Sequence, residues 1–231
     1  EPPPPSPRPD IPFDDFERPD HGAWTAEGTA FGQGPVEAAR MPEYQGRVNA
    51  QGQRLINSHA AAPGNEVGAR DAATGSLLSP PFAIERHYIN LRVGGGGHAG
   101  RTCVNLRIGD AVVASVTGRN ENVLTPRTLD ARAWQGRTAR LEIVDRESGG
   151  WGNIGVDEIV FSDTPWEKVP PLEEEEDFGT MALALLGTRS GSFARLQLEE
   201  GQGGDWAEAL LRSPETGGLS PGATAEIADR K

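Results

Sequence analysis

Residues 102–116 read Thr-Cys-Val-Asn-Leu-Arg-Ile-Gly-Asp-Ala-Val-Val-Ala-Ser-Val, two short runs separated by Gly109-Asp110. In the first run, apolar side chains alternate with polar ones, as they do in a strand that buries one face. The Gly-Asp pair has the length and the residue types of a tight hairpin turn. This stretch therefore predicts an antiparallel β-hairpin.

The alternation recurs on both sides of the hairpin. In residues 83–93, Leu91 and Val93 share one face with Ile89, whereas Asn90 and Arg92 point to the other. Segments 139–144 and 154–161 have the same pattern, and no segment has the apolar stripe of a helix. Short strands between Gly- and Pro-rich turns predict an all-β fold, an antiparallel β-sandwich of the jelly-roll, galactose-binding-like type.

The local amino-acid composition separates linker segments from the expected domain. The 30 Gly and 19 Pro of the 231 residues have no three-residue period, which excludes a collagen helix. Proline is dense in residues 1–10, which predicts a stiff linker, and residues 164–177 add five consecutive acids, which predict a solvated, acidic linker. The β-sandwich is then expected at 11–163, and 178–231 is expected to be a partial β-rich segment of a following domain.

Charge and cysteine content exclude several classes of protein. The net charge of −12 disfavours nucleic acid and anionic membranes as partners, because both need a basic surface. No run is long enough to span a membrane. Cys103 is the only cysteine, so no intrachain disulfide can form, and a buried thiol is expected. Because Glu1 replaces a starting Met and no signal peptide follows, we expect a processed product or a piece of a longer protein.

The sequence contains no recognisable catalytic motif. The four histidines lie in unrelated contexts without zinc-ligand spacing, and no nucleophile elbow is present. We therefore predict no catalytic residue, and whether the chain is an enzyme stays open. The run Gly94–Gly97 is interpreted as a flexible strand connection rather than a phosphate loop, with His98 free to face a ligand.

The loop Gly149-Gly150-Trp151-Gly152-Asn153 is the strongest candidate for a binding site. Glycines on both sides leave an indole face uncovered, and sugar rings stack on such faces while polar groups bind their hydroxyls. Trp151, Asn153, Asp145 and His98 are the predicted carbohydrate contacts. The alternative is that Trp151 packs beneath the loop as a core residue.

Acidic residues on the first and last predicted strands suggest a metal. Asp15, Glu17 and Asp157 supply the hard oxygen ligands that Ca²⁺ prefers, from strands that jelly rolls often bring together. The alternative is that these are solvated surface acids.

Several of these segments together resemble a known family. The chain is similar over residues 11–163 to the non-catalytic β-sandwich domain attached to bacterial levanases and related fructan-cleaving glycoside hydrolases. The resemblance implies a secreted, extracellular or periplasmic, accessory module whose partners are a carbohydrate of fructan or glucoside type and a catalytic domain elsewhere. The segments that carry it are 15–17, 28–35, 55–58, 75–82, 94–98, 102–106, 139–145 and 149–159.

A second likeness covers the tail. Residues 177–187 and 219–227 are similar to part of the N-terminal β-sandwich of bacterial glucosylceramidase-type β-glucosidases. Three hypotheses follow: a carbohydrate-binding accessory module, a structural spacer or protein-docking domain that positions the catalytic domain, or a fragment of a glycosidase without its catalytic domain.

Overall fold

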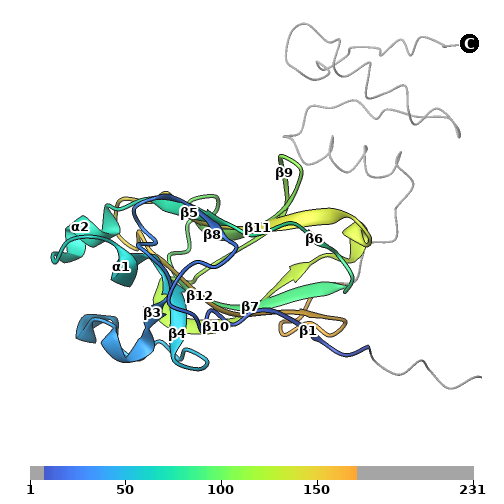
Figure 1. Ribbon diagram of the computed structural model, residues 1–231, viewed down its shortest axis with the longest axis horizontal. Coiled ribbons are helices and arrows are strands. Elements are labelled where there is room, and N and C mark those ends of the chain that lie inside the picture. Colours follow the sequence, from blue (N-terminus) through green and yellow to red (C-terminus); the bar gives the residue numbers. More distant parts are fainter. Residues whose placement is uncertain (1–7, 171–231) are drawn as a thin grey trace, which may run out of the picture. The chain divides into compact units, whose positions relative to one another are not determined.

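The alternating segments form two antiparallel sheets packed face to face in the computed structural model, which describes residues 8–170 (Figure 1). Each sheet has six strands, and every strand pairing is antiparallel. The predicted β-sandwich is confirmed.

The first sheet has the order β10-β7-β12-β4-β3, with β1 added beside β12. A bulge between Pro12 and Asp14 shifts the register of β1 against β12. Its strands are β1 (Ile11–Asp14), β3 (Val36–Glu37), β4 (Arg54–Asn57), β7 (Tyr88–Gly95), β10 (Glu121–Asp130) and β12 (Ile154–Ser162).

The second sheet has the order β2-β5-β11-β8-β9, with β6 added beside β11. The predicted hairpin is its β8–β9 pair, and Gly109 takes the left-handed φ of +58° that the turn needs. Its strands are β2 (Thr25–Gly28), β5 (Gly75–Leu78), β6 (Phe82–Ala83), β8 (Thr102–Ile108), β9 (Ala111–Thr117) and β11 (Thr138–Asp145).

Alternate side chains of both sheets meet in one apolar core. Leu91 of β7, Leu106 of β8 and Leu141 of β11 are fully buried, and Val156 of β12 packs among them. Cys103 is buried as well, which confirms the expected structural thiol. The alternation read from the sequence is thus the alternation of core and outer faces.

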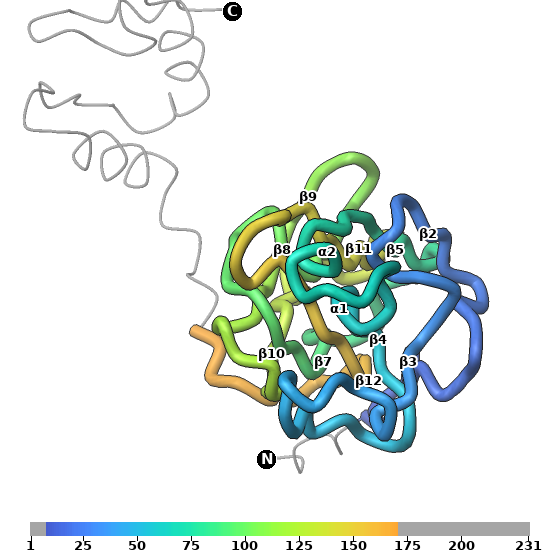
Figure 2. Tube along the Cα trace, turned by 90° about the vertical axis from the view of Figure 1, so that its left-hand side faces the viewer, coloured from blue at the N-terminus to red at the C-terminus, as the bar shows by residue number. Residues whose placement is uncertain are grey.

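Short helices were not predicted, because runs of three to five residues leave no periodic apolar stripe. Two of them, α1 and α2, lie across one end of the sandwich between the sheets (Figure 2). None of the helices in residues 8–170 has the length and apolar character needed to cross a membrane. The helical segments are η1 (Ala38–Arg40), η2 (Glu43–Gln45), α1 (Ser58–Ala61), α2 (Val67–Asp71) and η3 (Arg132–Trp134).

Residues 164–170, the first part of the predicted acidic linker 164–177, contact the first sheet. The backbone N–H of Trp166 donates to Asn90 Oδ1 at 3.0 Å, and Glu167 pairs with Arg127 at 3.0 Å. Asn90, predicted to face solvent, is buried by this segment. Polar groups on the outer face of β7 and β10 attract the segment, an effect that alternation alone does not reveal. The rest of the linker and the tail 178–231 lie outside the described residues.

The chain positions where the sandwich begins and ends lie side by side. Arg8 forms two parallel hydrogen bonds to Asp163, at 2.6 and 2.7 Å, and Ile11 of β1 faces Phe161 of β12. The chain therefore enters and leaves the sandwich at one edge of the first sheet.

We expect Leu141→Ala to lower the free energy of unfolding by about 2–5 kcal/mol, because it opens a cavity between the sheets. Val112→Ala is the control, since Val112 is exposed and its truncation should change stability by no more than about 0.5 kcal/mol. Urea denaturation measures both, and equal losses in the two variants would contradict this location of the core.

Candidate functional site

A pocket of about 190 Å³ lies where the Trp151 loop meets the helices at one end of the sandwich. Its lining comes from η2, α1, α2, the start of β10 and the loop between β11 and β12, so distant parts of the sequence build it. We call it the Trp151 pocket, and its lining residues are Tyr44, Gln45, His59, Val67, Asp71, Asn122, Trp151 and Asn153.

Trp151 presents its indole to solvent, with 40% of the residue exposed. Its φ of +60° is left-handed, a conformation that is uncommon for a bulky residue. Gly152 follows with no room for a side chain, because a Cβ there would lie 2.4 Å from the Glu147 carbonyl oxygen and 2.6 Å from that of Asp71. The loop is thus seated tightly on the end of α2, and Trp151 is an exposed platform rather than a core residue.

The glycine run Gly94–Gly97 supports this loop from below, which corrects its interpretation as a flexible connection. β7 continues to Gly95, and the N–H of Gly96 donates to the Asn153 carbonyl oxygen at 2.8 Å. A Cβ on Gly96 would lie 2.2 Å from the Trp151 carbonyl oxygen. Glycine is therefore required because two backbones touch here.

Helix α1 has only four residues, but side chains hold it at its N-terminus. Asn57 caps it by accepting from the N–H of Ala60 at 2.8 Å, and Ser58 Oγ accepts from the N–H of Ile154 at 2.8 Å. These bonds tie the helix to β12 and place His59, only 1% exposed, at the wall of the Trp151 pocket.

Three side chains form a hydrogen-bonded chain along this wall. His59 Nδ1 lies 2.5 Å from Asp71 Oδ1, and His59 Nε2 lies 2.8 Å from the Tyr44 hydroxyl. An ionised carboxylate only accepts hydrogen bonds, so Nδ1 carries a proton toward Asp71; when the ring is neutral, Nε2 is the acceptor for the Tyr44 hydroxyl. The sequence has no signal for this chain, because its members come from three elements with no common motif.

Amide side chains form another part of the pocket wall. Asn153 Nδ2 donates to Asn122 Oδ1 at 3.3 Å, and Gln45 Oε1 accepts from Asn57 Nδ2 at 3.3 Å. Asn153 is 95% buried, and its Oδ1 has no hydrogen-bond partner among the described residues. A buried acceptor without a partner is costly, so this oxygen is suited to a ligand or a water molecule.

Of the four predicted sugar contacts, Trp151 and Asn153 line the pocket, whereas Asp145 does not. Asp145 ends β11 and is fully buried, and its part in sugar binding stays a prediction. Burial is the main cause that raises the pKa of Asp145 to about 6, and the charges of Asp71 and Glu147 act in the same direction. The Ser58 side chain and the Glu147 backbone lie close enough to lower this pKa in part, although neither forms a hydrogen bond of good geometry with the carboxylate.

His98 is not among the residues that line the pocket. Its Nε2 lies 3.1 Å from the Gly150 carbonyl oxygen, and its Nδ1 lies 4.0 Å from Glu147, which pairs with Arg101 at 2.5 Å. His98 therefore contacts the Trp151 loop, and its contact with a sugar stays a prediction.

The predicted metal ligands do not form one cluster. In residues 8–170, no group of three or more His, Cys, Asp or Glu side chains has the arrangement of a metal site. Glu17 Oε1 accepts from the N–H groups of Gln53 and Arg54, and Asp157 Oδ2 accepts from that of Gln51. Glu17 and Asp157 thus both bind the backbone of residues 51–54. Asp15 is exposed, and its carboxylate accepts from the backbone N–H of Glu17. Calcium binding stays a prediction, but not through these three carboxylates as one site.

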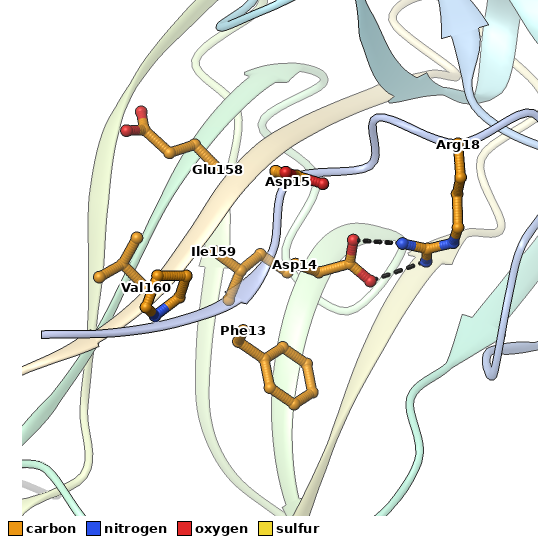
Figure 3. A pocket seen from close by; sticks show the side chains of 8 residues that line it. Phe13, Asp14, Asp15, Arg18, Glu158, Ile159 and Val160 are labelled. Carbon is orange, nitrogen blue, oxygen red and sulfur yellow. Dashed lines mark hydrogen bonds and ion pairs between the residues drawn. The ribbon is translucent and has the colours of Figure 1, made fainter.

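A larger pocket, of about 390 Å³, lies along the β1–β12 junction (Figure 3). Its central polar groups bind each other: Arg18 forms two hydrogen bonds of 2.7 Å to Asp14, which also accepts from Trp24 Nε1 at 2.7 Å. Phe13 stacks on Phe161 in the same region. Its central polar groups are thus already paired with one another, whereas the Trp151 pocket has an exposed indole at its rim.

A comparison with curated proteins finds a relative of similar sequence. No family model matches the chain. A protein named "Putative glycosyl hydrolase ecdE", from Aspergillus rugulosus, is 35% identical over 155 residues, which are 66% of this chain and 21% of the relative. The chain thus spans about a fifth of that protein's length.

Solved structures resemble the fold more distantly. A cyclase from Fischerella sp. TAU has 14% identity over 69% of this chain and 100% of its own, with a TM-score of 0.45. TmCBM61 in complex with β-1,4-galactotriose has 15% identity over 64% of this chain and 94% of its own, with a TM-score of 0.40. At these scores the likenesses carry no argument about a ligand, and the sandwich rests on the strand pairings described above.

We expect Asp145 to destabilise the fold as the pH rises. An unfolded aspartate has a pKa of about 3.9, so the folded protein, with a pKa of about 6, binds the proton more tightly. The resulting stability is present below pH 4 and is lost as the pH rises through 6. Relative to Asp145→Asn, the free energy of unfolding of the wild type should fall by roughly 2–3 kcal/mol between pH 4 and 7.5.

Urea denaturation across this pH range measures the difference. Asp110→Asn is the matched control, since Asp110 lies exposed in the β8–β9 turn. Parallel pH profiles for the wild type and Asp145→Asn would show that Asp145 has an ordinary pKa.

Proposed function

We propose that this chain is a non-catalytic carbohydrate-binding accessory module of a glycoside hydrolase and that it binds sugar in the Trp151 pocket. The observation that carries the proposal is the exposed indole of Trp151, held by a rigid loop beside a pocket lined with polar side chains. An apolar ring face with converging hydrogen-bonding groups is the combination that sugars need.

The size of the pocket favours a single sugar ring. Its volume of about 190 Å³ lies below the roughly 300–1,000 Å³ of pockets that take drug-sized ligands, which favours a small occupant. Tyr44, Asn122 and Asn153 offer hydrogen bonds to ring hydroxyls. The module would then hold one residue of a glycan rather than a long stretch of it.

The relative supports the link to glycoside hydrolysis, because its name describes a glycosyl hydrolase. The matched region is 21% of that protein, which leaves ample length for a catalytic domain outside it. A fructan or glucoside as the ligand, a catalytic domain in the parent chain, a bacterial origin and secretion to the periplasm or the cell exterior all belong to this proposal.

The lining of the Trp151 pocket favours binding over hydrolysis. Glycosidases generally use two carboxyl groups on either side of the scissile bond. Within residues 8–170, Asp71 is the one carboxylate that lines this pocket. The hypothesis of a glycosidase fragment therefore requires catalytic residues elsewhere.

A second role, as a spacer that positions the catalytic domain, is favoured by the packed segment 164–170. Glu167 pairs with Arg119 and Arg127, and Arg132 donates to the Pro170 carbonyl oxygen at 2.7 Å. A spacer needs such a fixed exit from its fold. This role is compatible with sugar binding at the other site.

We expect Trp151→Ala to weaken sugar binding at least about tenfold, because it removes the stacking surface. Its unfolding free energy should change by no more than about 1 kcal/mol, since the side chain is largely exposed. Affinity electrophoresis in gels containing levan, inulin or β-glucans, followed by calorimetry on the retaining polysaccharide, measures the binding.

The matched control is Trp166→Ala, which removes a tryptophan from the segment on the first sheet, away from the pocket lining. Its retention should equal that of the wild type. A folded wild-type protein that no polysaccharide retards would overturn the proposed function, and a large stability loss in Trp151→Ala would favour the spacer role alone.

A further inference from the structure

The Trp151 pocket offers acceptors of hydrogen bonds in fixed positions. Tyr44 is 56% exposed, and with a neutral His59 its hydroxyl proton is directed to Nε2, because Nδ1 donates to Asp71. The phenol oxygen is therefore left with its lone pairs for a ligand. His59 and Asp71 thus determine what Tyr44 can recognise.

Asn153 adds a second acceptor. Its amide N–H₂ group faces Asn122 Oδ1, which leaves the buried Oδ1 without a partner among the described residues. Since 95% of this residue is buried, water has little access to the oxygen from outside the pocket. A ligand that donates a hydrogen bond here would relieve an unsatisfied acceptor.

The charge around the pocket is negative. Asp71 lines it, and within residues 8–170 its one ion-pair partner is His59, which carries a charge only when it is protonated. Asp145 lies close enough for the charge on Asp71 to raise its pKa, and the described residues give it no ion-pair partner. Among residues 8–170, the pocket lining contains no arginine or lysine.

We infer that the Trp151 pocket selects an amino sugar, whose protonated amine is held by Asp71 and Tyr44 while its ring stacks on Trp151. An ammonium group is a donor with three N–H bonds and no acceptor, which matches the acceptors described here. Its positive charge is favoured both by the carboxylate and by the face of an indole ring. This inference rests on the proposed function, and it favours amino-substituted glucosides over fructans.

The test compares three ligands that differ only at C2: methyl β-glucosaminide, methyl β-glucoside and methyl N-acetyl-β-glucosaminide. Their dissociation constants are measured with the full chain by NMR titration at pH 6.5, where the free amine is charged. We expect the glucosaminide to bind at least about tenfold more tightly than the other two. The preference should shrink in 0.5 M NaCl, because part of it is electrostatic.

Two variants assign the preference to the pocket. Asp71→Asn removes the charge and should bring the glucosaminide within about twofold of the glucoside, whereas Asp110→Asn, the same change in an exposed turn, should keep the full preference. Tyr44→Phe should weaken binding of the glucosaminide about threefold to tenfold, the usual effect of losing one hydrogen bond. This variant also removes the hydrogen bond to the buried His59 Nε2, so its thermal midpoint is measured as well and the titration is done well below that temperature.

The outcomes separate the two proposals. Equal binding of all three glycosides, or tighter binding of the glucoside or the N-acetyl derivative, overturns the inference and leaves sugar binding in place. An equal loss of preference in Asp71→Asn and Asp110→Asn also overturns it, since the effect would then come from net charge. Binding of none of the three, together with no retention by any polysaccharide, overturns the proposed function itself.

Discussion

The packing of alternate side chains between the two sheets is the constraint on which the other features depend. Leu91, Leu106 and Leu141 come from three strands and have no solvent exposure, so a shift of one residue in any of these strands would turn polar groups inward. This register fixes where each strand ends, and the strand ends fix the loops that build the Trp151 pocket. A pocket on loops is precise here because the strands beneath it cannot slide.

Contacts between backbones transfer that precision to the binding site. The loop that carries Trp151 lies directly on the glycine run at the end of β7, and its Gly152 lies against the end of α2. A side chain at Gly96 or Gly152 would push the Trp151 loop away from β7 or α2. Glycine, often taken as a sign of mobility, therefore works here as a close-packing residue, and the left-handed Trp151 is held with its ring turned outward.

The fold could be read from the sequence because a period of two is a local signal, and β7, β8, β11 and β12 carry it. The site could be read only in part. Trp151 and Asn153 belong to one glycine-framed motif, whereas the Tyr44–His59–Asp71 chain is assembled from three separate elements and has no pattern in sequence. Asp145 and His98 lie near the motif in space, but sequence spacing does not report that Asp145 is buried or that His98 contacts the loop.

The adjacency of Arg8 and Asp163 has a mechanical consequence. Because β1 and β12 run antiparallel and the pair closes their shared end, tension applied through these two residues separates the strands from that end. The hydrogen bonds between β1 and β12 then break one after another from that end, whereas a shearing force would load all of them at once. The edge strand β1 would yield first, while the interior strands that support the Trp151 pocket carry little of the load.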